Sequence, residues 1–174
     1  MKKGMLFAAA FIFLSFLGIV PAPALADGGK YAYVDVAKVF DQYQKTKDND
    51  KLLQQAGKKK EQERDVLVNE IRQLKDELLL LSDEAKAKKQ DVLQGQVKKL
   101  SDFDRDTRQA LGEDRNKVVQ DIFKDIDNTV QRYGERKGLE LVFNERALLY
   151  HNPKMDITQD VLNELNKEYT SKRR

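Results

Sequence analysis

The middle of the chain has apolar residues at alternating spacings of four and three, the repeat of a coiled coil. The first series contains Leu67, Ile71, Leu74, Leu78 and Leu81, with charged residues between them. A second, mostly helical series contains Leu93, Val97, Leu100, Phe103, Thr107, Leu111, Val118, Ile122, Ile126, Val130 and Tyr133. No proline lies between Ala24 and Asn152. The pattern therefore predicts two long helices that pack against each other.

A turn between the two series is predicted at Ser82. Serine is a good N-cap, and Asp83 and Glu84 suit the first turn of a new helix. We expect an antiparallel hairpin over 48–137, with helices over about 48–81 and 83–137, the first on the order of 50 Å long at 1.5 Å per residue. Folding at Ser82 places the polar stretch 58–65 opposite the polar stretch 101–108, so the hairpin should pack well near its tip and loosely midway.

The segments that flank this hairpin have shorter patterns of apolar, β-branched and aromatic residues. The expected elements are a strand over 31–36, a helix over 37–44, strands over 139–144 and 147–150 that form a hairpin, and a helix over 160–169. Gly134 and Gly138 mark the end of the long helix, and Asp156 and Gln159 have the spacing of a capping box before the last helix.

These elements predict an α+β fold in which the two chain ends, over 27–47 and 138–174, form one small base. The base holds about 55 residues, close to the size at which a single core is marginally stable. Self-association would stabilise such a base.

The N-terminus has the pattern of a secretory signal peptide over residues 1–26. Lys2 and Lys3 precede an uncharged run of 16 residues, and Ala24-Leu25-Ala26 is a small-x-small cleavage site. A membrane anchor is the alternative, but this run is shorter than the roughly 20 residues that span a bilayer. We expect an exported protein that begins at Asp27.

Charge and cysteine content exclude several classes of protein. The chain has 32 basic and 29 acidic residues, and its net charge of +3 falls to +1 without Lys2 and Lys3. Such a balance disfavours a strongly basic nucleic-acid binder. Charged residues make up 35% of the chain, against about 25% in an ordinary domain, which leaves little for a large core. Without cysteine there are no disulfides and no thiol chemistry.

The single histidine, His151, lacks the partners that catalysis or metal binding requires. No second histidine and no cysteine are present to form a nucleophile pair or a nitrogen and sulfur metal site. We expect a histidine at the surface or in a turn. The sequence also has no P-loop and no Ser-His-Asp set, so neither an ATP-driven machine nor an enzyme is expected, and no cofactor is assigned.

Four acids match the ligand spacing of an EF-hand calcium loop: Asp102, Asp104, Asp106 and Glu113. The match fails at Thr107, which occupies the position where the loop requires glycine. Because the helical pattern of apolar residues continues through this segment, we expect a solvated helix face and no metal site.

The predicted hairpin tip combines apolar and basic residues. The candidate contacts with another molecule on the hairpin are Leu78, Leu79, Leu80, Leu81, Lys86, Lys88, Lys89 and Phe103. Four consecutive leucines cover every side of a helix, so some must face outward, although part of the run packs the turn. The lysines could contact anionic lipid or lipopolysaccharide, at about 1 kcal/mol each near a charged surface. Plain solubility of the helix is the alternative explanation for them.

The whole chain after the signal peptide resembles the Skp/OmpH family of periplasmic chaperones. The similar segments are YAYVDVAKVF, the turn LLSDEAKAKK and the block KGLELVFNERALLYHNPKMDITQDVLNELN. The last block is the most specific, because coiled-coil sequences resemble one another.

The resemblance implies a homotrimer in which short strands form a shared β-barrel body. Three helical hairpins then project around a cavity that holds unfolded outer-membrane proteins in the periplasm. The body residues implied for this chain are Ala32, Val34, Val36, Leu141, Phe143 and Leu148. A structural coiled-coil scaffold or spacer of the cell envelope is the alternative function. Composition does not separate the two, but a spacer has no need of the strand-rich C-terminal block, which favours an ATP-independent holdase.

Overall fold

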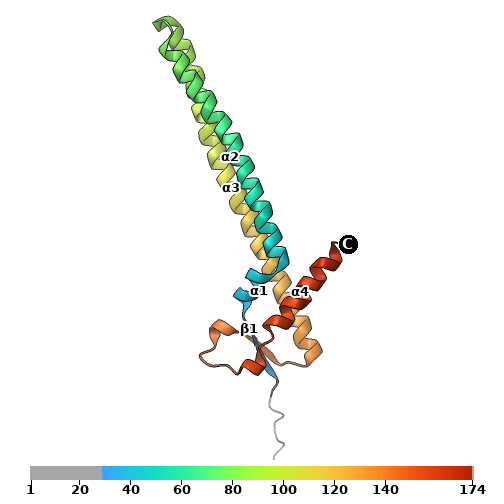
Figure 1. The fold of residues 1–174 in the computed structure, drawn as a ribbon. Coiled ribbons are helices and arrows are strands. Elements are labelled where there is room, and N and C mark those ends of the chain that lie inside the picture. Colours follow the sequence, from blue (N-terminus) through green and yellow to red (C-terminus); the bar gives the residue numbers. More distant parts are fainter. Residues whose placement is uncertain (1–28, 174) are drawn as a thin grey trace, which may run out of the picture.

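The computed structural model describes residues 29–173, and the predicted signal peptide lies outside them. In chain order the elements are β1 (Tyr31–Val34), α1 (Val36–Gln42), α2 (Gln44–Leu79), α3 (Asp83–Lys137), β2 (Leu141–Asn144), the short 3-10 helices η1 (Glu145–Ala147) and η2 (Pro153–Met155), and α4 (Thr158–Lys172). Helices α2 and α3 form one long antiparallel arm that stands on a small base made by the other elements (Figure 1). The expected α+β class is confirmed.

Local signals set the ends of α3. The helix begins at Asp83, and Ser82 before it is extended as an N-cap residue should be, although its hydroxyl makes no capping hydrogen bond. At the other end Gly138 adopts a φ of 62°, a left-handed conformation that glycine reaches without strain. The backbone N–H groups of Gly138 and Leu139 then donate to carbonyls of the last turn. Both predicted ends of this helix are confirmed.

Helix α2 begins at Gln44, one turn earlier than the sequence predicts. Tyr43 is extended, with ψ of 129°, and separates α2 from α1. The backbone N–H of Gln44 donates to Oδ1 of Asn166 in α4 at 2.8 Å. This partner from a distant helix satisfies one of the donors that a helix start leaves unpaired, so the extra turn is stable.

Strands β1 and β2 pair in parallel, from Tyr31 opposite Leu141 to Val34 opposite Asn144. Parallel pairing is possible because the entire arm serves as the crossover between them. The predicted hairpin of strands over 139–144 and 147–150 is therefore wrong. The Asn144 side chain accepts from the backbone N–H of Arg146 at 3.2 Å, and this turn starts η1 and directs the following residues away from the sheet.

The core lies in the base, where β1, α1, the lower end of α3 and α4 meet. Its fully buried side chains include Val39, Ile122, Ile126, Val161 and Leu165. Helix α4 begins after Asp156, whose Oδ1 accepts from the backbone N–H of Thr158 at 2.8 Å. The predicted capping box is only half formed, because the Gln159 side chain donates to Asn163 instead.

Candidate functional site

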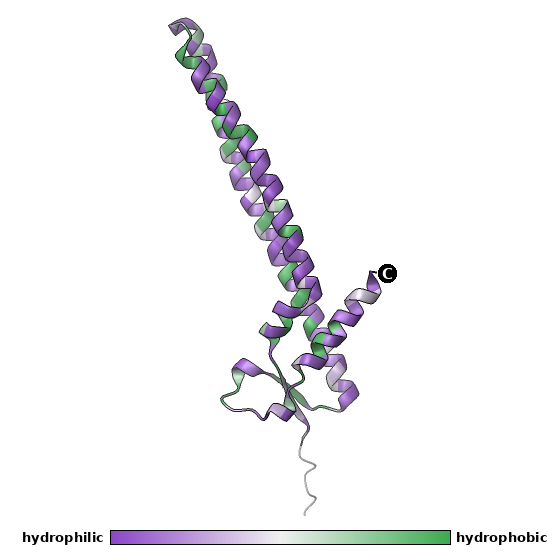
Figure 2. Ribbon diagram, in the orientation of Figure 1, coloured by the Kyte–Doolittle hydropathy of each residue, from purple (hydrophilic) through white to green (hydrophobic). Residues whose placement is uncertain are grey.

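The arm is the largest candidate surface for binding another molecule, and its two helices are joined by the predicted apolar seam. Leu67 and Ile71 are the buried residues of this seam in the upper half of the arm. Most other positions on the arm are hydrophilic (Figure 2). Among the helices of residues 29–173, none is both long enough and apolar enough to cross a bilayer.

The middle of the arm is loosely packed, as the polar stretches predict. A hollow of about 310 Å³ opens between α2 and α3, with Gly57 on one side and Phe103 on the other. The ammonium group of Lys60 lies over the Phe103 ring, 5.4 Å from its centroid. Arg64 and Asp104 form an ion pair across the helices at 3.0 Å. Charged contacts thus replace apolar packing here, and Phe103 is half-buried beneath Lys60.

The four leucines at the tip divide into two pairs. Leu78 and Leu81 are half-buried and pack the turn, whereas Leu79 and Leu80 are 78% and 88% exposed. The sequence left open which of the four face outward, and the geometry of the turn decides it. The tip therefore presents a small apolar patch (Figure 2).

Two of the three lysines at the tip lie close to acidic side chains. Lys86 lies 3.6 Å from Asp83 on the same helix, and Lys89 forms an ion pair with Glu77 on the facing helix. Lys88 makes no ion pair within the described residues. The hairpin brings Glu77 alongside Lys89, a proximity that the spacing of these residues in the sequence does not show.

The six residues assigned to the body by resemblance lie in three environments. Ala32 and Val34 are buried in the core of the protomer itself, each 3% exposed. Val36 and Leu148 are half-buried. Leu141 and Phe143 lie on β2 and are exposed, with the Phe143 ring 6.5 Å from that of Tyr31. Of the six residues, only Leu141 and Phe143 leave a substantial apolar surface exposed, to which another molecule could bind.

His151 lies in the segment between η1 and η2 and is half-buried. Its ring packs against Tyr33 with centroids 4.2 Å apart, and its Nε2 lies 3.3 Å from Oε1 of Glu145. Across residues 29–173 no group of three or more histidine, cysteine or acidic side chains is arranged to hold a metal ion.

The four acids with EF-hand spacing all lie on α3. Asp102 contacts Lys98 at 2.6 Å and Arg105 at 3.0 Å, and the hydrogen bond from Lys98 is the main cause that lowers the pKa of this carboxyl. Asp106 contacts Arg105 at 3.1 Å, and Glu113 accepts from Gln109 at 2.9 Å. Asp102, Asp106 and Glu113 lie on one charged face of the helix, as expected, whereas Asp104 points to the facing helix α2 and pairs there with Arg64.

Leu149 and Tyr150 were expected in a strand from their pattern, but they follow η1 and are almost fully exposed.

The structure also forms a pocket that the sequence does not indicate. It lies at the root of the arm and is lined by residues around 43–45, 125–132 and 165–173. No local pattern could have identified that pocket, because its parts lie on three separate segments.

Comparison with known proteins places this architecture. The family model for outer membrane proteins of the OmpH-like type matches residues 30–165. A crystal structure from Caulobacter crescentus, described as a candidate outer membrane chaperone (OmpH-like), has the same fold, with a TM-score of 0.69 at 18% identity over 84% of this chain and 88% of that chain. No curated protein matches. Because the family model covers well over half of its length, the chain belongs to the OmpH-like family of outer membrane proteins.

Proposed function

We propose that the protein is an ATP-independent holdase chaperone that keeps unfolded outer-membrane proteins from aggregating in the periplasm. The observation that carries this proposal is the arm, a long helical pair with a charged surface and few exposed apolar side chains, standing on a compact base. Membership in the OmpH-like family supports it, as does the fold shared with a candidate chaperone.

Clients would be held by many weak contacts. The exposed apolar residues of the arm are scattered, and they include Leu52, Val66, Leu79, Leu80, Val92 and Val97. Burying one such side chain completely contributes about 1.5–3 kcal/mol, so partial contacts contribute less. Charged side chains between them interrupt the apolar surface, so no continuous apolar patch forms along the arm. An unfolded chain would therefore be shielded and still be able to leave.

The arms would enclose a client only if several copies assemble, and we propose a homotrimer joined through the bases. The resemblance supplies the number three. Support for the location comes from the outer edge of β2, which has no partner strand within residues 29–173, and from the exposed Leu141 and Phe143 on that strand. Residues 148–150 are a second candidate, since Leu148 is extended and the two side chains after it are exposed.

The tip is a proposed secondary contact with anionic lipid or lipopolysaccharide. Leu79 and Leu80 offer apolar side chains, and Lys88 in the first turns of α3 offers an ammonium that has no ion-pair partner among residues 29–173. Because Lys86 and Lys89 already lie close to acids, the electrostatic part of this contact should be weak.

The proposed function is tested by diluting a urea-unfolded outer-membrane β-barrel protein into buffer with this protein and following light scattering. We expect suppression near one trimer per client, with no effect of added nucleotide. A variant with residues 58–108 replaced by a short glycine turn should lose the suppression while keeping the base, whose core lies outside that segment. Equal suppression by this variant would place client binding in the base. No suppression by the full-length protein would favour the scaffold function.

A further inference from the structure

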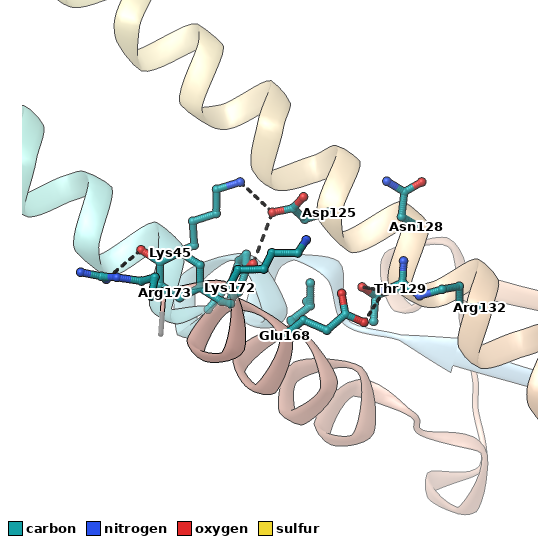
Figure 3. Close-up of a pocket in the computed structure, with 11 residues that line it drawn as sticks. Lys45, Asp125, Asn128, Thr129, Arg132, Glu168, Lys172 and Arg173 are labelled. Carbon is teal, nitrogen blue, oxygen red and sulfur yellow. Dashed lines mark hydrogen bonds and ion pairs between the residues drawn. The ribbon is translucent and has the colours of Figure 1, made fainter.

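Three parts of the chain meet at the root of the arm and enclose a pocket of about 260 Å³ (Figure 3). One wall comes from the junction of α1 and α2, one from α3 and one from the C-terminal half of α4. Leu165 and Tyr43 are buried in its floor, and the rings of Tyr43 and Tyr169 meet edge to face with centroids 5.9 Å apart. The guanidinium of Arg173 lies 5.3 Å from the centroid of the Tyr169 ring. The pocket thus has an aromatic interior.

Cations outnumber acids among the residues that line this pocket. Lys45, Arg132, Lys172 and Arg173 supply four positive charges, and Asp125 and Glu168 supply two negative ones. Lys45 pairs with Asp125 at 2.7 Å, and Arg132 pairs with Glu168 at 2.5 Å. Arg173 pairs with Asp48, at the margin of the pocket.

Neither acid of the pocket needs Lys172 as a partner. Oδ2 of Asp125 already accepts from the ammonium of Lys45 and, at 3.3 Å, from the hydroxyl of Tyr43. Burial, together with the charge of Asp125, raises the pKa of Tyr43 far above its ordinary value, so this hydroxyl stays protonated and donates. Within the described residues Lys172 makes no ion pair, and its side chain extends from α4 toward the interior of the pocket (Figure 3).

Two further donors line the pocket from α3, on the wall opposite α4. Arg132 uses only its Nη2 atom for both of its hydrogen bonds, to Thr129 and Glu168, so its other N–H groups remain available. The side-chain amide of Asn128 makes no hydrogen bond in the part of the chain that the structure describes. The ammonium of Lys172 and the guanidinium of Arg132, both exposed to solvent, therefore border one opening over an aromatic floor, and the Asn128 amide stands above them on α3 (Figure 3).

We propose that this pocket binds a carboxylate carried next to an aromatic or aliphatic side chain, as in one residue of a peptide. Its volume lies just below the usual range of about 300–1,000 Å³ for ligand pockets, which suits one side chain with its charged group. Arginine and lysine donors suit a carboxylate. Asp125 and Glu168 would repel the second charge of a phosphate dianion, which favours the singly charged group. This site is separate from the client contacts proposed for the arms.

The test is isothermal titration calorimetry of the full-length protein with blocked peptides of one or two residues. N-acetyl-phenylalanine carries a terminal carboxylate beside a ring, and N-acetyl-aspartyl-phenylalaninamide carries the carboxylate on a side chain. Binding of either supports the proposal, and the tighter one identifies the source of the carboxylate. N-acetyl-phenylalaninamide, which lacks the charge, should not bind, and inorganic phosphate should bind more weakly than the carboxylates.

The matched variants are Lys172→Gln and Lys167→Gln, because Lys167 lies on the same helix but does not line this pocket. We expect about tenfold weaker binding for Lys172→Gln, the loss of one charge-assisted hydrogen bond, and no change for Lys167→Gln. In nuclear magnetic resonance spectra the side-chain amide signal of Asn128 should shift on binding. The proposal is overturned if neither carboxylate binds, if the uncharged amide or phosphate binds as tightly, or if both variants bind like the wild type. The light-scattering assay is independent of each of these results.

Discussion

The exposed and buried faces of the strands predict that Phe143→Asp and Val34→Asp act through different mechanisms. Phe143 lies on β2 and is 39% exposed, so the folded protomer should tolerate a polar residue there. Val34 is buried in the protomer core, where Asp would be an unpaired charge. The first substitution should therefore disrupt assembly, whereas the second should disrupt folding of the base.

The magnitudes follow from the areas involved. An aromatic side chain has roughly 200 Å² of surface, so covering the exposed part of Phe143 in a trimer removes about 80 Å² from water, or about 2 kcal/mol per protomer. Three such contacts contribute about 6 kcal/mol, equivalent to about 10⁴-fold in the trimer dissociation constant. Val34→Asp removes a buried apolar side chain and buries an unpaired carboxylate, so we expect a loss of more than about 3 kcal/mol from a total of about 5–15 kcal/mol.

Sedimentation velocity and thermal unfolding separate the two cases. If the wild type sediments as the proposed trimer, the Phe143→Asp variant should sediment at the same concentration as a folded monomer, with the unfolding transition of its base retained. The Val34→Asp variant should lose the cooperative unfolding transition of the base. If Phe143→Asp remains trimeric with unchanged affinity, this face of β2 is not the assembly surface, and the argument from exposure fails.

Three further outcomes are expected. Gly138→Ala should lower the free energy of unfolding by about 1–2 kcal/mol in denaturant titration, because φ is 62° there; an unchanged midpoint would contradict this. Hydrogen bonds from Gln44, and then from Tyr169 and Arg173, lower the pKa of Asp48 below its ordinary 3.8. The stabilising contact of Asp48 with α4 is therefore present above pH 3.8 and is lost as the pH falls through the lowered pKa. The unfolding temperature of the Asp48→Asn variant should lack the part of the acid dependence that comes from this carboxylate. Replacing both Leu79 and Leu80 by Ser should leave the unfolding temperature unchanged and weaken client protection in the light-scattering assay, and a large loss of stability would show that these leucines pack in the folded protein.

The arm could be predicted from the sequence because its signals are local. The alternating spacing of apolar residues sets the seam, and neighbouring residues set the ends of α3 at Asp83 and Lys137. Helical hydrogen bonds join residues four apart, so a short window of sequence contains most of what decides them. The loose packing midway also followed from the polar stretches on the two helices.

The base could not be predicted in the same way. Two apolar runs close together in sequence indicate a hairpin, yet β2 pairs with β1, whose partner residues are separated from it by the entire arm. Strand β2 could pair with the nearby run 147–150 or with the distant β1. The turn that begins at Asn144 directs the nearby run away from β2, so β1 becomes its partner. The same pairing decides that Val34 enters the core and Phe143 faces outward.

In the candidate sites too, some features follow from the sequence and others only from the tertiary structure. The sequence by itself determined that leucines and lysines gather at the tip, but only the folded turn decided that Leu79 and Leu80 face outward and that Glu77 lies beside Lys89. The pocket at the root of the arm depends wholly on tertiary structure. Its residues come from three segments, and no one segment contains both the aromatic floor and the full set of donors, so packing of the helices creates the pocket.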